Sequence, residues 1–472
     1  MTVLWTAQEA KAATGGQGPD GWNAAGVSID SRTLEPGDLF VALQGETHDG
    51  HDHVAKALAA GAAAAMTDRL PDGVDETAPL LCVADTRAGL EALGRAGRTR
   101  FAGTVVALTG SVGKTGTKEM LARMLSLQGE TAATRGNLNN HIGAPLTLAR
   151  LPRDAAYAVI ELGMNHAGEI AALTQMVRPH CALITRIAPA HTAFFASVDA
   201  IADAKAEIFE GLEPDGAAII NADDGYTGRL TAAARRNGAG RVLRFGEAPQ
   251  AEARLLSCDL AADGSAVEAD ILGRRLGYRL GAPGRHWVMN SLAALAAVAA
   301  IGADLERAAA TLADQQPPAG RGATERLTLP QGTITLIDES YNASPAAMRA
   351  AIAVLATHTP EAGGRRIAVL GDMLELGETA AAEHGALGRR LAASPVDCVF
   401  AAGPEMPALV GHLRPEQRAG YAVDSAMLAA EIVPALRAGD VVLVKGSLGI
   451  AMARVIRVLR AAAAREGGAD AL

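Results

Sequence analysis

The feature that most constrains this chain is a regular alternation of apolar strand segments and helical segments that begins near Thr104. Strands connected through helices run parallel, so the alternation predicts an open parallel sheet with helices on both faces. Such sheets bind ligands beyond the carboxyl ends of their strands, so we expect the polar groups there to converge. The strands are residues 105–109, 158–160, 182–185 and 217–220, and the groups after them are residues 110–115, Glu161, His191, and Asn221 with Asp223 and Asp224.

The first hundred residues form a smaller alternation. Residues 25–29 and 39–43 predict strands, and residues 51–61 and 86–97 predict helices. The basic stretch 95–100 is interpreted as a connection. These patterns predict a small α/β unit ahead of the main sheet.

A third alternation follows a Pro- and Gly-rich stretch at residues 316–322, which predicts a linker or hinge. Ahead of the linker, residues 252–280 lack a helical period and predict a small antiparallel excursion, and residues 288–301 predict a helix. The last strands are residues 333–337, 366–370, 396–401 and 441–444. With 472 residues, the chain is expected to form three α/β domains, over residues 1–100, 101–318 and 319–472, the last of them Rossmann-like.

Charge and composition exclude several classes of protein. The formal net charge is −9 and no Lys- and Arg-rich block occurs, which argues against a nucleic-acid partner. The longest apolar helix candidate, residues 291–303, is too short to span a bilayer, and residues 1–13 lack the apolar core of a signal peptide. The 4 cysteines are far apart, which fits a reducing compartment. We expect a cytoplasmic, monomeric enzyme without a membrane partner.

Residues 110–115 have the composition of a phosphate-binding loop between a strand and a helix, which is expected over residues 118–128. Glycines let backbone N–H groups approach phosphate oxygens, and a helix N-terminus adds positive potential. Lys114 would reach the outer phosphates and the Thr115 hydroxyl would bind Mg²⁺. Leu108 stands where the first glycine of the full motif belongs, so the loop alone indicates only a nucleoside triphosphate.

Motifs across essentially the whole chain resemble the Mur ligase family, the ATP-dependent amino-acid adders of peptidoglycan synthesis. The first block resembles the family's UDP-binding domain, the second its ATPase domain, and the third its C-terminal domain. The matching segments are residues 29–32, 36–40, Gly45 and 49–50; then 110–115, 137–140, Gly143, Pro145, 161–163, His191, Lys205, His286 and Asn290; then Arg321, 338–345 and 371–377.

The resemblance implies ATP and Mg²⁺ as cofactors and a role for each matching residue. It makes Lys114, Lys205 and His191 catalytic, and Thr115, Glu161, His191 and Lys205 the magnesium site. It makes Ser31, Arg32, Asn139 and Asn140 substrate-binding residues. The implied ATP-binding residues are Gly110, Ser111, Val112, Gly113, Lys114, Thr115, Gly116, Asn290, Arg321 and Asp338.

Residues 338–345 and 371–377 resemble the branch of the family that adds D-alanyl-D-alanine to a UDP-muramoyl-tripeptide, through an acyl phosphate. The alternatives are the ligase that adds the third amino acid, a folylpolyglutamate synthetase, or a motor ATPase, because residues 335–339 resemble a Walker B strand. The block at residues 30–32 has no use in a motor and argues against the folate enzyme. The third residue of the tripeptide, diaminopimelate or lysine, stays open.

Lys205 shares the apolar face of an expected helix, residues 199–212, with Ile201, Ile208 and Leu212. Burial lowers the pKa of a lysine, a neutral amine reacts with CO₂, and a carbamate supplies oxygens for Mg²⁺. The family carries a modified lysine at the matching segment, here residues 204–208, so we expect Lys205 to be carbamylated. The alternative is a lysine whose stem covers apolar surface while its amine reaches water.

Three other groups have competing interpretations. Glu161 could instead cap a helix or face solvent, and His191 could be a core histidine. The cluster His48, Asp49, His51, Asp52 and His53 has the composition of a metal site, but its segment matches a loop of the UDP-binding domain, so no metal is assigned to it.

Overall fold

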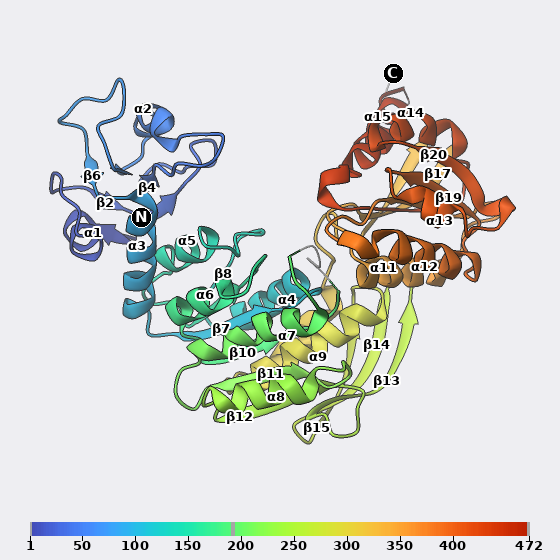
Figure 1. The fold of residues 1–472 in the computed structure, drawn as a ribbon, viewed down its shortest axis with the longest axis horizontal. Helices are drawn as coiled ribbons and strands as arrows, with labels where there is room; N and C mark the ends of the chain where they lie inside the picture. The colour runs from blue at the N-terminus through green and yellow to red at the C-terminus, as the bar shows by residue number, and fades with distance from the viewer. Residues whose placement is uncertain (1, 190–193, 470–472) are drawn as a thin grey trace.

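The computed structural model describes residues 2–189 and 194–469. Three sheets, of four, nine and six strands, occupy successive parts of the chain, and a two-stranded ribbon lies near the N-terminus. Figure 1 shows the blue N-terminal part and the red C-terminal part at opposite ends of the green central part. The predicted three-domain α/β fold is confirmed, while the boundaries near residues 100 and 318 stay predictions.

The N-terminal part is built on a four-stranded parallel sheet in the order β3-β4-β5-β6. Helix α1 starts with a capping box, in which Thr6 and Glu9 each accept a hydrogen bond from the other's backbone N–H. The elements are β1 Trp5–Thr6, α1 Ala7–Thr14, β2 Asn23–Ala24, β3 Gly26–Ser28, β4 Asp38–Val41, η1 Gly50–His53, α2 Val54–Ala59, β5 Ala64–Thr67, β6 Leu80–Cys82 and α3 Thr86–Arg100.

The prediction that residues 95–100 form a connection is wrong, because they are the last turns of α3. Two of their basic side chains, Arg98 and Arg100, pack inward, while Arg95 is exposed. The Arg98 guanidinium is buried and donates to the carbonyls of Val177 (2.6 Å) and Arg178 (2.7 Å), at the end of helix α6 (Glu169–Val177). Arg100 stacks on the Trp5 ring, 3.6 Å from its centre. Helix α3 thus joins the first domain to the central one.

The central domain contains a nine-stranded sheet in the order β15-β14-β13-β12-β11-β10-β7-β9-β8. Strands β7 to β13 run parallel to one another. Strands β13, β14 and β15 form the predicted antiparallel excursion. The strands are β7 Thr104–Thr109, β8 Thr131–Ala133, β9 Tyr157–Glu161, β10 Cys181–Ile184, β11 Ala217–Asn221, β12 Arg241–Gly246, β13 Ala253–Ala261, β14 Gly264–Ile271 and β15 Arg274–Leu280.

Helices cover both faces of this sheet, as predicted. Helices α4 and α9 pack on one face, and α5 to α8 pack on the other. Helix α4 begins at Lys114, four residues earlier than expected, because Gly113 adopts a left-handed conformation that opens it directly. The remaining helical elements are α4 Lys114–Ser126, α5 Gly143–Ala149, α7 Val198–Ala206, η2 Glu207–Gly211, α8 Thr227–Arg236, α9 Arg285–Ala300, α10 Leu305–Ala310 and η3 Thr311–Asp314.

The third domain is a doubly wound six-stranded sheet in the order β16-β17-β21-β18-β19-β20, parallel except for β16. Helices α11 and α12 cover one face, and α14 and α15 cover the other. The elements are β16 Ala323–Leu329, β17 Gly332–Glu339, α11 Pro345–Thr357, β18 Arg366–Gly371, η4 Gly377–Thr379, α12 Ala380–Ala392, β19 Cys398–Ala402, α13 Met406–Val410, η5 Pro415–Gln417, β20 Arg418–Ala422, α14 Ser425–Ala435, β21 Val441–Lys445, η6 Leu448–Ile450 and α15 Ala453–Ala469. Among the described residues, no helix combines the length and apolarity that a membrane span requires.

The joint between α3 and α5 predicts a stability effect. A Cβ at Gly97 would lie 2.3 Å from the Leu148 carbonyl oxygen, so the two helices can approach only because this residue is glycine. Gly97→Ala is expected to lower the free energy of unfolding by about 1–3 kcal/mol, the usual cost of overpacking. Thermal or urea unfolding measures this. Gly228→Ala is the matched control, because its Cβ in helix α8 meets nothing within 4 Å and should be neutral or stabilising. Equal effects of both changes would contradict the packing argument.

Candidate nucleotide and magnesium site

The loop after β7 is a rigid backbone cradle, and two glycines are required to build it. Gly110 has φ +151°, and a Cβ there would lie 1.9 Å from the Thr185 hydroxyl; Gly113 has φ +86°. The Thr185 hydroxyl, just after β10, donates to the Val112 carbonyl (2.6 Å), and the Ser111 hydroxyl donates to the Ala188 carbonyl (2.8 Å). The loop is therefore held from the neighbouring strand before any ligand binds.

Lys114 is the first residue of α4 and folds back over this loop. Its Nζ donates to the Gly110 carbonyl at 2.7 Å. Burial lowers the pKa of Lys114, the negative charge of Glu161 opposes that shift, and the charge of Arg321 adds to it. The amine thus lies within electrostatic reach of a carboxylate from β9 and of an arginine from the start of the third domain.

Glu161 ends β9 beside Thr115 and is 1% exposed. Its Oε1 accepts a hydrogen bond from Asn139 Nδ2 (2.7 Å) and a longer one from the Thr115 hydroxyl (3.4 Å), while its Oε2 is buried without a hydrogen-bond partner in the described structure. An unpaired buried carboxylate oxygen is unfavourable without a cation. Carboxylate, hydroxyl and amide oxygens suit Mg²⁺, so these residues fit that ion. This burial argues against the alternative interpretation of Glu161 as a solvent-facing residue.

Lys205 lies in the last turn of α7 and is 1% exposed. Burial is the largest cause that lowers its pKa well below the ordinary value, and the nearby charge of Lys114 adds to it, while Glu207 opposes it. A lysine that extends its amine into water would not be buried in this way. The amine is therefore close to the phosphate loop and inclined to be neutral, as a reaction with CO₂ requires.

His191 lies outside the described residues, and its role stays a prediction. Asn290, on α9, contacts the loop: a Cβ at Gly113 would lie 2.7 Å from Asn290 Oδ1. A Cβ at Gly116 would lie 2.8 Å from the Trp287 ring, so α9 packs against the first turn of α4 at both positions.

The third domain brings Arg321 within electrostatic reach of Lys114, while Asp338 interacts with residues of its own domain. The Arg321 guanidinium stacks on Tyr341 at 4.0 Å. Asp338 is buried; its Oδ1 accepts from the Ser340 hydroxyl (2.6 Å) and its Oδ2 lies 3.4 Å from Arg460. Burial lowers the pKa of His286 at the start of α9. The charge of Glu339 opposes that shift, and the charge of Lys445 adds to it. The central and third domains therefore meet at this end of α9.

The predicted substrate residues are divided between two places. The Arg32 side chain is 80% exposed and holds Asp30 through two nitrogens, which lowers the pKa of Asp30 to about 2; Ser31 precedes it in the first domain. Asn139 contacts Glu161, as described above. Asn140 Oδ1 accepts from the N–H of Gly143, the first residue of α5 (3.0 Å).

The histidine-rich loop of the first domain is held by ion pairs and hydrogen bonds. His51 is buried, with Nδ1 2.6 Å from Asp49 and Nε2 3.2 Å from Asp68. Arg69 pairs with both carboxylates. In the part of the chain that the structure describes, no group of three or more His, Cys, Asp or Glu side chains forms a metal site.

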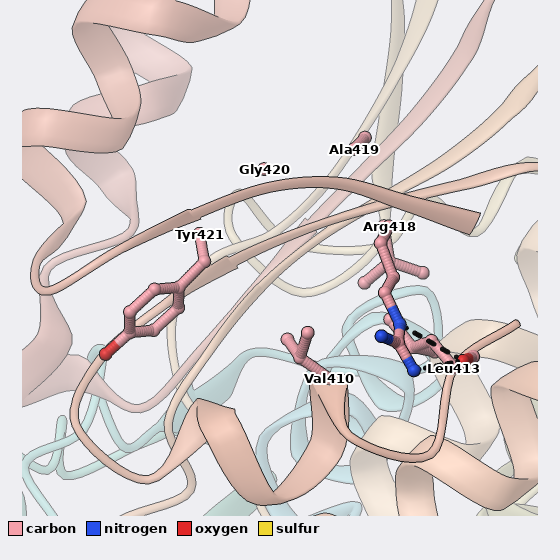
Figure 2. A pocket seen from close by; sticks show the side chains of 7 residues that line it. Val410, Leu413, Arg418, Ala419, Gly420 and Tyr421 are labelled. Atoms are coloured by element: carbon pink, nitrogen blue, oxygen red, sulfur yellow. Dashed lines mark hydrogen bonds between the residues drawn. The ribbon is translucent and has the colours of Figure 1, made fainter. Parts of the chain in front are cut away.

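A small pocket of about 170 Å³ lies on the edge strand of the third domain (Figure 2). Its lining contains none of the predicted site residues, so we assign it no part in the site. The lining residues are Val399, Val410, Leu413, Arg418, Ala419, Gly420 and Tyr421.

Three family models match the chain in order. They are the Mur ligase family catalytic domain over residues 23–90, the Mur ligase middle domain over 108–298, and the Mur ligase glutamate ligase domain over 324–448. The UDP-N-acetylmuramoyl-tripeptide--D-alanyl-D-alanine ligase of Escherichia coli (strain K12) is 38% identical over 440 residues, 92% of this chain and 93% of that protein. The chain belongs to the Mur ligase family.

Other Mur ligases are similar over the same length. The ligase of the same name from Bacillus subtilis (strain 168) is 33% identical over 92% of this chain and 93% of its own. The crystal structure of MurF from Acinetobacter baumannii superposes with a TM-score of 0.84 at 34% identity, covering 97% of this chain and 99% of that one. MurF ligase from Thermotoga maritima, in complex with ADP, gives 0.77 at 27% identity, covering 93% and 98%.

Sequence reasoning missed two residues that support the site, Thr185 and Lys118; the Lys118 Nζ donates to the carbonyl of Thr134, whose hydroxyl accepts from the Glu161 N–H. Thr185 ends a predicted strand, but its bond to Val112 depends on β7 and β10 being neighbours in the sheet. Lys118 is three residues after Thr115, on the same face of α4, and that spacing was a usable signal.

The loop geometry predicts the effect of removing Lys114. Lys114→Ala should retain the fold and lose more than about 100-fold in turnover, because the lost contact is one that stabilises transferring phosphate. Steady-state kinetics and circular dichroism measure this, with Lys56→Ala on exposed α2 as the control. A variant that keeps more than about a tenth of the wild-type rate, a loss below ~1.4 kcal/mol, would show that residues 110–115 are not the catalytic loop.

Proposed function

We propose that this Mur ligase joins D-alanyl-D-alanine to a UDP-N-acetylmuramoyl-tripeptide at the expense of ATP, in the cytoplasm. The main support for this proposal is the 38% identity, over 92% of the chain, to the Escherichia coli enzyme named for that reaction. The structure of a UDP-N-acetylmuramoyl-L-alanyl-D-glutamate--2,6-diaminopimelate ligase is only 18% identical with a TM-score of 0.51, a likeness of fold alone. The ligase that adds the third residue is therefore the less favoured assignment.

The reaction requires activation of a carboxylate, because its oxygen is a poor leaving group. A terminal carboxylate oxygen of the tripeptide attacks the γ-phosphorus of ATP, and ADP leaves. The dipeptide amine then attacks the carbonyl carbon of this acyl phosphate, loses a proton and expels inorganic phosphate. Lys114 and Arg321 neutralise the phosphoryl charge, and the cradle of residues 110–113 orients it. Mg²⁺ supplies further charge neutralisation when it is bound at Thr115 and Glu161.

We place the incoming dipeptide at the carboxyl ends of β17, β21 and β18 in the third domain, where ligands of parallel sheets bind. Two exposed leucines there, Leu374 (40%) and Leu448 (62%), offer apolar surface for two methyl groups. Leu374 lies beside Gly449, the residue after Leu448, because a Cβ at Gly449 would lie 2.9 Å from Leu374 Cδ1. Closure about residues 316–322 would bring this edge to the phosphate loop and exclude water, which otherwise hydrolyses the acyl phosphate.

A motor ATPase is the competing proposal from another class. It would hydrolyse ATP without small-molecule substrates and would leave the first domain, matched over residues 23–90, without a role. In the ligase proposal that domain binds the UDP group through Ser31 and Arg32. All of the candidate groups come from one chain, so we expect a monomer to be active.

The substrate assignment predicts when phosphate is released. Release should require UDP-N-acetylmuramoyl-tripeptide and D-alanyl-D-alanine together, because the acyl phosphate needs both a carboxylate donor and an amine acceptor. A phosphate assay with each substrate omitted in turn measures this. Equal release with a single amino acid in place of the dipeptide would contradict the assignment, and release with ATP alone would favour the motor.

We further propose that Lys205 is carbamylated. The nitrogen of the neutral amine attacks CO₂ and loses a proton, so the residue becomes an anion within electrostatic reach of Lys114. A lowered pKa makes the neutral amine more abundant near pH 7 than in an exposed lysine, which is the form that reacts. We propose that the carbamate oxygens then help Thr115 and Glu161 to hold Mg²⁺.

Carbamylation predicts chemical rescue. Lys205→Ala should be nearly inactive, and a short carboxylic acid at high concentration should restore part of the rate by replacing the lost anion. Lys205→Arg is the control, because its side chain fills the space and should not be rescued. Incorporation of ¹³C-labelled CO₂, observed by NMR, provides a second measurement. Near-normal activity of the alanine variant, or no labelled carbamate in the wild type, would contradict the proposal.

A further inference from the structure

Lys118 is buried to the same degree as Glu161 and has no part in the reaction described above. It is 1% exposed, and its Nζ donates to the Thr134 carbonyl at 2.7 Å. It also pairs with its neighbour Glu119 (2.6 Å), a residue that is partly exposed. A lysine is rarely buried so fully, because removing an ammonium from water is unfavourable unless its partners compensate.

Thr134 connects Lys118 to Glu161. The Thr134 hydroxyl accepts a hydrogen bond from the Glu161 N–H at 3.0 Å, and the Thr134 N–H donates to the Val159 carbonyl (3.0 Å). Buried Thr134 therefore forms three hydrogen bonds: its carbonyl accepts from Lys118, and its hydroxyl and N–H bond to β9. A shift of Thr134 would move the backbone of Glu161 directly.

The segment that carries Thr134 needs such an anchor. Strand β8, which precedes it, has three residues, forms the edge of the sheet and pairs with β9. After Thr134 the chain continues into the loop whose Asn139 binds Glu161 Oε1. The Lys118 contact therefore fixes the start of the loop that holds the Glu161 carboxylate.

Helix α4 consequently holds Glu161 at two points. Thr115 and Lys118 are three residues apart and share one face of the helix. Thr115 reaches the carboxylate itself, and Lys118 reaches the backbone through Thr134. The helix that presents Lys114 to the phosphates thus also sets where the carboxylate stands.

We propose that Lys118 is a positioning residue, which couples the phosphate-binding helix to the magnesium-binding carboxylate of Glu161 through Thr134. The inference rests on the proposed function only in taking Glu161 as a magnesium ligand. It predicts a specific defect: the protein should still bind nucleotide, but Mg²⁺ should no longer strengthen that binding to the normal extent.

The test measures ADP affinity by calorimetry with and without Mg²⁺, in the absence of tripeptide and dipeptide, so no turnover occurs. In Lys118→Met, metal-free affinity should stay within about twofold of wild type, while the tightening by Mg²⁺ should fall about tenfold. Glu161→Gln should show the same loss, and the double variant should lose no more, because the two residues act through one contact. Lys118→Arg, which keeps a donor, should restore part of the tightening.

Two further variants serve as a control and as a second test of the same connection. Arg123→Met, on the exposed side of α4, is the matched control and should behave as wild type. If Lys118→Met does not fold, Thr134→Val tests the same connection, since it removes the acceptor of the Glu161 N–H and leaves Lys118 in place. Equal weakening of ADP binding with and without Mg²⁺ would show that Lys118 only supports the helix, and unchanged tightening would also overturn the inference. If wild-type ADP binding does not respond to Mg²⁺, the magnesium assignment of Glu161 fails first, and the inference fails with it.

Discussion

Glu161, Lys114 and Lys205 bring one carboxylate and two amines to the same edge of the central sheet, where burial weakens screening by water. The charge of Lys114 adds to the burial of Lys205 in lowering its pKa, so the protein resists holding both ammonium groups charged. A carbamate would make Lys205 an anion, so that Lys114 would interact with two anionic groups, the carbamate and Glu161. The same change would give a divalent cation two anions to bind. In this view, the negative charges of the carbamate, Glu161 and the phosphate groups are balanced by the positive charges of Lys114 and the metal ion.

That edge depends on neighbouring strands more than on any motif. Strands β7, β9 and β10 lie side by side, so the loop after β7, Glu161 at the end of β9 and Thr185 after β10 meet. The alternation of strands and helices correctly predicted that the phosphate loop and Glu161 meet, because parallel order follows from crossover connections. The glycine-rich loop and its helix were also predictable from residue types alone.

The contacts that fix the site could not be read from the sequence, since they join residues far apart along the chain. Thr134 reaches Glu161 across 27 positions, and Gly97 meets the Leu148 backbone only because α3 packs on α5. Short or charged strands were missed for another reason. Strand β8 has three residues, and β12 contains Arg241 and Arg244, so neither has an apolar run long enough to predict it. Basic residues 95–100 gave the wrong expectation because a helix can bury arginine when carbonyl groups receive the guanidinium.

The link between the second and third domains shows which groups must change partners when substrates bind. Arg321 already lies within electrostatic reach of Lys114. The pKa of His286 responds to the charges of Glu339 and Lys445 across the domain boundary. Asp338, by contrast, has both oxygens engaged, by Ser340 and Arg460. If Asp338 binds ATP, as the resemblance implies, one of these contacts must be exchanged for the ligand. The Arg460 contact is the longer of the two and is partly exposed, so it is the weaker one and the one that a closing domain can give up with the smallest loss.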